Sequence, residues 1–188
     1  MRDYKCLKNS SFEEDDFALI PIRDQDKYDI LKMRNEQIYH LRQAEVLSIE
    51  KQEYYFSHVI SKLFEQEKPA QILFSLLRGK EFIGYGGLVH LNWTDKNAEI
   101  SFIMRTELEQ KEFSLIWLKY LSLIKNVAFN EMKFHKIFTY AFDLRPHLYS
   151  VLLKSGFDEE ARLKEHCRFD NKYIDVVIHS KINPNAHD

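Results

Sequence analysis

The sequence contains little glycine and little cysteine. Its 188 residues include five glycines and two cysteines, Cys6 and Cys167. Two cysteines do not form a disulfide framework in a chain of this length, so we expect both thiols to be reduced. The glycine-rich signatures of P-loop and dinucleotide-binding proteins do not occur, and neither does the G-x-S-x-G turn of serine hydrolases. These three classes of protein therefore lack the motifs that would support them.

The sequence also lacks a long apolar run and a large excess of either charge. No run of 18 apolar residues occurs, so no membrane-spanning helix is expected. The N-terminal residues are polar and acidic rather than arranged as a signal peptide, which predicts a cytoplasmic protein with no membrane partner. The formal net charge of −2 provides no basic field for nucleic acid. No C-x-x-C or H-x-x-x-H pair occurs, so no metal site is expected.

What the sequence does contain is an alternation of strand-like and helix-like segments. Its composition, 45% hydrophobic and 30% charged, is typical of a globular protein. Residues that alternate in polarity and lie between short turns predict strands, and apolar residues at helical spacing predict helices. The predicted strands are 17–23, 71–78, 82–89, 98–104, 136–142, 157–169 and 173–182. The predicted helices are 24–36, a segment that begins at Ser48 and ends before Pro69, 113–130, and a short helix that ends at Gly156.

The predicted order is β-α-α-β-β-β-α-β-α-β-β. It indicates an α/β (α+β) domain whose mixed central sheet has about seven strands, with an antiparallel N-terminal meander and flanking helices. The helix between 98–104 and 136–142 predicts that these two strands lie parallel. We expect one domain over residues 17–182, a flexible lead-in over residues 1–16 and a flexible tail over residues 183–188.

Eight short stretches stand out by their order and spacing: residues 33–36, 48–50, 55–56, 83–88, 97–101, 152–157, 160–162 and 171–177. Together with the element order, they resemble the GNAT N-acetyltransferase superfamily, and in particular its ribosomal-protein N-acetyltransferase branch. The resemblance covers about residues 17–182. It implies a GNAT fold and the transfer of an acetyl group from acetyl-CoA to a primary amine. The acceptor is left open between an amino sugar, a small amine and a protein N-terminus.

One segment departs from the family pattern. The resemblance places the CoA pyrophosphate on residues 109–114, where the family carries R/Q-x-x-G-x-G/A and this chain carries Glu-Gln-Lys-Glu-Phe-Ser. Glu112 stands at a glycine position, where a carboxylate adds bulk and repels an anion, and Lys111 partly offsets that repulsion. The departure leaves an alternative open, namely a GNAT-fold binding or regulatory module that has lost acyl-CoA catalysis.

Two residues are candidates for the chemistry. Glu99 interrupts an apolar strand, where a carboxylate is costly unless it is paired or hydrated. It is the predicted general base, because an acceptor ammonium must lose a proton before it attacks a thioester. The structural alternatives are a glutamate satisfied by a neighbouring arginine and one at the end of the strand that faces water. Tyr149 lies one helical turn before Leu152, the position of the family's acid. It is the candidate for protonating the thiolate, or else a packing residue.

Two binding surfaces are expected: the resemblance implies one for acetyl-CoA, and a loop beside the sheet suggests one for the acceptor. The residues assigned to acetyl-CoA are Phe102, Ile103 and Met104 for pantetheine, and Gln110, Lys111, Phe113, Ser114 and Arg145 for the phosphates. The residues assigned to the acceptor are Arg34, Asn35, Tyr85, His90 and Trp93, because loops on a rigid scaffold commonly carry binding residues. For Trp93, packing on the sheet is the alternative. The expected partner is a small-molecule amine or amino sugar, and the expected state is a monomer or homodimer.

Overall fold

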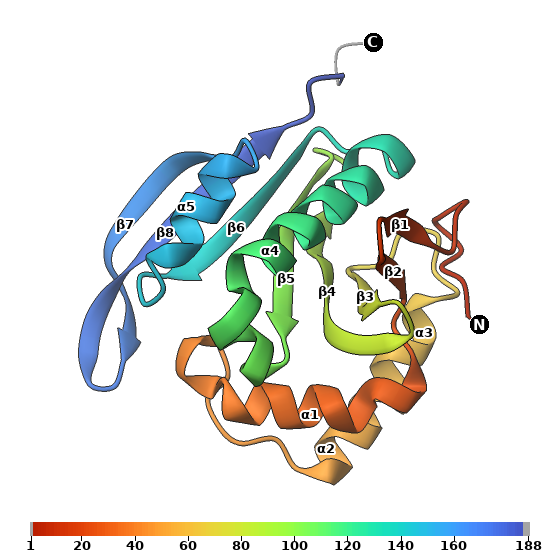
Figure 1. The fold of residues 1–188 in the computed structure, drawn as a ribbon, viewed down its shortest axis with the longest axis horizontal. Helices are drawn as coiled ribbons and strands as arrows, with labels where there is room; N and C mark the ends of the chain where they lie inside the picture. The colour runs from red at the N-terminus through yellow and green to blue at the C-terminus, as the bar shows by residue number, and fades with distance from the viewer. Residues whose placement is uncertain (1, 186–188) are drawn as a thin grey trace.

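A single eight-stranded sheet runs through the computed structural model, which describes residues 2–185 (Figure 1). The strands are ordered β1-β2-β3-β4-β5-β6-β8-β7, and among the described residues only the β5–β6 pair is parallel. The strands are β1 (Phe12–Glu14), β2 (Phe17–Pro21), β3 (Ile72–Arg78), β4 (Glu81–Asn92), β5 (Asn97–Met104), β6 (Lys136–Phe142), β7 (Asp158–Phe169) and β8 (Lys172–Ile182). The predicted meander and the predicted parallel pair are confirmed. The sheet has one strand more than expected, because Phe12–Glu14 pairs with β2 at the edge.

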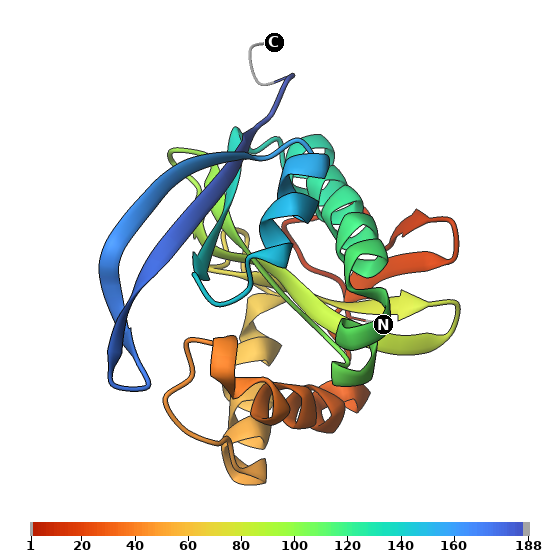
Figure 2. The ribbon, with the colours of Figure 1, turned by 60° about the vertical axis from the view of Figure 1, so that its left-hand side comes forward.

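Helices cover both faces of this sheet (Figure 2). They are α1 (Lys27–Glu36), α2 (Ile49–Tyr54), α3 (Ser61–Leu63), α4 (Thr106–Lys125) and α5 (His147–Lys154). Side chains on a strand alternate between faces, so neighbours on β5 show which helix lies where. Phe102 stacks on Tyr120 of α4 at 3.9 Å, whereas Tyr85, which pairs with Ile103, reaches Arg34 of α1. Helices α4 and α5 therefore cover one face, and α1 and α2 cover the other.

A glycine on β4 allows α4 to approach the sheet closely. A Cβ atom at Gly86 would lie 2.2 Å from the Ser101 carbonyl oxygen and 2.7 Å from the Tyr120 hydroxyl. That hydroxyl donates to the same Ser101 oxygen at 2.8 Å. The missing side chain thus lets a buried tyrosine of α4 reach the backbone of β5, which fixes the helix over the strand.

Helix α4 begins earlier than the sequence predicts. The expected helix starts at residue 113, but the observed one starts at Thr106, and a π-helical segment (Asn126–Glu131) extends its C-terminal end. Residues 109–114, expected to form a phosphate-binding loop, lie inside the helix. Its one non-helical residue is Glu112, with φ −131° and ψ 21°. The first turn carries Glu107 and Glu109, whose carboxylates suit the positive end of the helix dipole.

Within residues 2–185, both end segments of the chain pack against the rest of the domain. Tyr4, in the expected flexible lead-in, is 1% exposed and donates its hydroxyl to the Leu73 oxygen at 2.9 Å. Its ring stacks on Phe64 at 4.4 Å. In the expected flexible tail, Asn183 is buried and donates to the Phe134 oxygen at 3.0 Å. The last three residues of that tail, 186–188, lie outside the described residues.

Over residues 2–185, every helix is too short or too polar to span a membrane.

Candidate functional site

Strands β5 and β6 separate after a short stretch of pairing. Asn97 pairs with Lys136, Ala98 with Ile137 and Glu99 with Phe138. Within the described residues, β5 and β6 do not pair with each other beyond Glu99 and Phe138. Beyond that point β5 continues beside β4 alone, and β6 continues beside β8 alone. The facing edges of 100–104 and 139–142 therefore present backbone groups that a ligand can bind.

A cavity of about 230 Å³ lies between the diverging strands. Phe102 and Ile103, expected beside pantetheine, line it from β5, and Arg145 lines it from the loop before α5. Met104, the third expected residue, does not line it. The Met104 carbonyl oxygen instead accepts a hydrogen bond from Gln37 Nε2 at 2.7 Å. The part of β5 available to a ligand is thus 100–103.

Glu99 sits at the last paired position, where the strands part. Its side chain is 6% exposed, and its two oxygens face two basic groups. Arg42 Nη2 pairs with Oε1, and His90 Nδ1 lies 2.9 Å from Oε2. The predicted structural alternative, a neighbouring arginine, is therefore present as Arg42. The His90 side chain is 68% exposed, so the buried carboxylate is linked to solvent through an imidazole.

A break in the β4–β5 ladder aims His90 at Glu99. The register shifts between Val89 and Asn92, and His90 has φ 51°. Bulges of this kind commonly redirect a side chain beside a functional site. A β-branched residue would be strained in this backbone conformation, which histidine tolerates better.

Tyr149 does not reach this cavity. Its hydroxyl donates to Asp143 Oδ1 at 2.6 Å, and its ring stacks on His179 of β8 at 5.0 Å. Burial, followed by the bond to Asp143, raises the pKa of Tyr149. Leu148, one residue earlier on α5, lines the cavity instead. The structure therefore separates the two residues that the sequence proposes for catalysis, because α5 turns Tyr149 away from Glu99.

Four β6 residues beyond the branch point line the cavity and were not anticipated, and two of them, Thr139 and Tyr140, are polar. Tyr140 lies under the Arg42 guanidinium, whose carbon is 4.7 Å from the ring centroid. Burial, and then Cys167 at 3.6 Å from its hydroxyl, raise the pKa of Tyr140. The Thr139 hydroxyl is buried without a hydrogen-bond partner among the described residues, as are both ring nitrogens of its cross-strand neighbour His179. The only sequence signal was a pair of polar residues in the middle of a strand that is otherwise apolar after Lys136.

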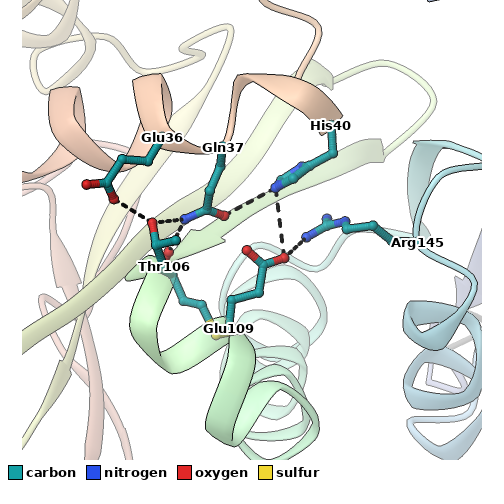
Figure 3. A network of polar contacts seen from close by, with 7 residues as sticks. Glu36, Gln37, His40, Thr106, Glu109 and Arg145 are labelled. Atoms are coloured by element: carbon teal, nitrogen blue, oxygen red, sulfur yellow. Dashed lines mark hydrogen bonds and ion pairs between the residues drawn. The ribbon is translucent and has the colours of Figure 1, made fainter.

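A polar network includes His40 and Arg145, two residues that line the cavity (Figure 3). Arg145 Nη1 donates to Glu109 Oε1 at 2.7 Å, and His40 Nε2 lies 3.9 Å from the same oxygen. Gln37 contacts His40 at 3.2 Å and Thr106 at 3.2 Å. The end of α1, the first turn of α4 and the loop before α5 are thereby joined. Arg145, an expected phosphate ligand, lines the cavity but is already paired with a carboxylate.

His40 is buried within this network. Burial is the main cause that lowers its pKa to about 3, and the positive charge of Arg145 adds to the effect. The imidazole is therefore neutral at ordinary pH, and the ionic contact in the network is the one between Glu109 and Arg145.

The other expected phosphate ligands lie on α4 and do not line the cavity. They are Gln110, Lys111, Phe113 and Ser114. Phe113 packs against His147 with ring centroids 4.4 Å apart. The carboxylate of Glu112, at the helix break, pairs with Arg78 Nη1 at 2.9 Å. The expected pyrophosphate loop is thus a helix whose acidic residue already has a basic partner on β3.

Three of the five expected acceptor residues converge. Arg34, Tyr85 and His90 line a second cavity of about 190 Å³, between the sheet and the helices α1 and α2. Asn35 is turned away and binds the backbone of Leu47, with its Nδ2 2.9 Å from the oxygen. Trp93 donates to the Pro69 oxygen at 2.9 Å and packs edge-on against Phe134, as its structural alternative predicts.

Comparisons with known proteins agree with this architecture. A family model described as an acetyltransferase (GNAT) domain matches residues 19–178. A spermidine N-acetyltransferase from Vibrio cholerae, solved with CoA and spermine, is similar with a TM-score of 0.77 and 20% identity, over 92% of this chain and 99% of that one. Mutant forms of the spermidine/spermine N-acetyltransferase SpeG from Vibrio cholerae have a TM-score of 0.74 and 21% identity, over 89% of this chain and 94% of that one. No curated protein sequence matches this chain significantly.

Proposed function

Because the chain belongs to the GNAT acetyltransferase family, we propose that acetyl-CoA binds between β5 and β6 and that Glu99 accepts the proton of an acceptor amine there. The chain is an N-acetyltransferase with acetyl-CoA as its donor. The observation that supports the assigned site is the position of Glu99, which is buried at the point where the two strands part.

In the proposed reaction the pantetheine arm lies between the strands and pairs with the free backbone edge of 100–103. The amine approaches from the α1–α2 face, to which Glu99 points. Glu99 removes one proton from the ammonium, and His90 conducts it to solvent. The amine nitrogen then bonds to the thioester carbon, and backbone N–H groups near residues 99–102 stabilise the oxyanion. The C–S bond breaks as the amide forms, and the nitrogen gives its second surplus proton to water.

We further propose that the CoA thiolate leaves without a dedicated tyrosine acid. Leu152 occupies the position where many family members carry that tyrosine, and the hydroxyl of Tyr149 is held by Asp143. A thiol has a pKa of roughly 8.5, so its thiolate is a good leaving group near neutral pH and can take a proton from water. In this mechanism, Tyr149 packs α5 onto the sheet.

The acceptor is proposed to be a small molecule with a primary amine. The second cavity adjoins Glu99 through Arg42 and His90, and its volume of about 190 Å³ suits a small ligand. The relatives named for spermidine make polyamines one candidate class. Three further points remain predictions. They are membership of the ribosomal-protein branch, a cytoplasmic location, and a monomeric or homodimeric state.

The decisive test is Glu99→Gln, assayed for thiol release from acetyl-CoA with a panel of primary amines. We expect the variant to bind acetyl-CoA like the parent and to lose roughly a hundredfold in rate at neutral pH, which is the usual contribution of a positioned base. The loss should shrink as pH rises, because more of the amine then arrives deprotonated. Glu160→Gln, which removes a surface ion-pair carboxylate, is the matched control. A variant that acetylates at the parent rate would exclude Glu99 as the base.

A further inference from the structure

We infer that the acceptor carries an anionic group, a carboxylate or a phosphate, in addition to its amine, and that Arg34 binds this anion. The inference rests on the proposed function and deepens it, because it concerns the same acceptor cavity. It also departs from the polyamines for which the similar structures are named.

The first observation is the state of Arg34. Its guanidinium is half-buried, with Nε bonded to Gln43 at 2.9 Å and Nη1 bonded to the Tyr85 hydroxyl at 3.1 Å. Both partners are neutral, and within residues 2–185 Arg34 forms no ion pair. A guanidinium has five donors, so these two bonds leave three for a ligand. A partly desolvated charge without a counter-ion is costly, and an oxyanion is the partner that its planar fork fits best.

The second observation is the charge of the cavity wall. The side chains lining the 190 Å³ cavity include Arg34, Arg42 and His90, and the rest of the wall is uncharged: tyrosine, glutamine, serine and five apolar residues. In the described part of the chain, no aspartate or glutamate lines this cavity. Glu99 contacts Arg42 and His90 of this wall, and it already pairs with Arg42. A molecule with several positive charges and no anion would meet the guanidinium of Arg34, which has no counter-ion within residues 2–185, and would be repelled by it.

The arrangement also fits the proposed chemistry. Arg34 and Arg42 line both this cavity and the cleft between the strands, so an anion held by Arg34 places the rest of the same molecule beside Glu99. Glu99 and His90 would then receive the amine end. Positive charge around the anion and a carboxylate beside the amine together orient a molecule that carries both groups.

The test compares acceptors that differ only in the anion. The first pair is an α-amino acid and its carboxamide, the second is glucosamine 6-phosphate and glucosamine, and spermidine is the fifth acceptor. We expect the anionic member of at least one pair to exceed its neutral partner by tenfold or more in kcat/KM, and spermidine to be poor. The pair that responds distinguishes a carboxylate from a phosphate.

Variants of Arg34 then locate the effect. Arg34→Gln should raise KM for the anionic acceptor by roughly tenfold to a hundredfold, as expected for a lost charged hydrogen bond, and leave KM for acetyl-CoA unchanged. Arg34→Lys should retain part of the preference, which shows that charge and not folding is responsible. Arg168→Gln, an exposed arginine on β7, is the control.

Three results would overturn the inference. The anionic acceptors could be no better than their neutral partners, or Arg34→Gln could raise KM for acetyl-CoA instead, which would assign Arg34 to the donor. An absence of turnover with all five acceptors, while acetyl-CoA still binds, also counts against the inference but leaves the donor site of the proposed function standing. Only a failure to bind acetyl-CoA would contradict the donor site itself.

Discussion

At the residue scale, Glu99 and Tyr149, the two predicted catalytic residues, have different surroundings. Glu99 is a carboxylate with two basic neighbours, both of which are exposed to solvent. Tyr149 is a hydroxyl whose partner is a carboxylate and whose ring packs on His179. A general base must release the proton that it has accepted before the next turnover. In the proposed mechanism, Glu99 releases that proton to solvent through His90. Tyr149 is instead held as a donor to Asp143.

We therefore expect Tyr149→Phe to leave kcat nearly unchanged. The variant keeps the ring and loses the bond to Asp143, which should cost about 1 kcal/mol in the free energy of unfolding. Steady-state acetylation between pH 6 and 9, together with urea denaturation, provides the measurement. A fall in kcat that grows with pH would instead identify Tyr149 as the acid for the thiolate, because the loss of a needed proton donor is felt most where protons are scarce.

His40 predicts a pH dependence of stability. Its pKa is about 3 in the folded protein, mainly because of burial, against an ordinary value of roughly 6.5 in the unfolded chain. Between these two pH values the unfolded chain binds the extra proton, so the stability that His40 contributes above pH 6.5 is lost as pH falls toward 3. From pH 7 to pH 5 the loss should be at most about 2 kcal/mol.

Urea denaturation of His40→Gln at pH 7 and pH 5 tests this expectation. The variant should show a smaller loss of stability than the parent over that interval. His58→Gln, which changes an exposed histidine, should follow the parent. An equal loss in all three proteins would show that His40 takes up its proton without cost to the fold.

At the scale of elements, strands were easier to predict than the start of α4. The meander of β3, β4 and β5 followed from alternating polarity and short turns, which are local signals. The family pattern suggested a loop at 109–114, although the Glu- and Lys-rich stretch before Phe113 favours a helix by intrinsic propensity. β1 was missed because its short sequence, Phe-Glu-Glu, is mostly polar and gains its order from pairing with β2.

The candidate site residues show the same contrast between local sequence signals and tertiary contacts. Glu99, Arg34, Tyr85 and His90 were predicted as site residues because they lie in or beside predicted elements, and they line one or both of the two cavities. Arg42 was missed because it lies in the connection between α1 and α2, where no periodicity marks it. Its role depends on a tertiary contact with Glu99, 57 positions away in the chain. Such contacts have no local signature.

The break in α4 leads to a prediction for Glu112. Its carboxylate pairs with Arg78 at 2.9 Å and stands where the family carries glycine. Glu112→Gly removes a negative charge, releases Arg78 for a phosphate and frees the backbone, so CoA should bind several-fold more tightly. Glu112→Gln, which removes the charge alone, should give a smaller gain, and Glu107→Gln is the control on the exposed side of the helix. Isothermal titration with CoA measures all three, and weaker binding in Glu112→Gly would show that CoA uses the Arg78–Glu112 pair as it stands.

At the scale of the whole molecule, the sheet consists of two halves that are joined by a short stretch of pairing between β5 and β6. β1 to β5 form one half, and β6, β8 and β7 form the other, with three residue pairs joining β5 to β6. The Glu109–Arg145 pair crosses the same boundary between α4 and the loop before α5. A ligand that lies between β5 and β6 and pairs with both edges should therefore join the halves as well as fill the cavity.

Acetyl-CoA should for this reason stabilise the folded protein measurably. Ligand at a hundred times its dissociation constant adds about 2.7 kcal/mol, which in a chain of this size raises Tm by roughly 5 to 10 °C. Because the expected pyrophosphate loop is a helix with Glu112 paired to Arg78, we expect pantetheine to supply most of the binding. Adenosine 3′,5′-bisphosphate, which lacks the pantetheine arm, should then shift Tm far less than CoA at equal concentration. Differential scanning fluorimetry with the three ligands measures these shifts. An equal shift with the bisphosphate would move the main contact to the phosphates, and no shift with acetyl-CoA would favour a GNAT-fold module that has lost its donor.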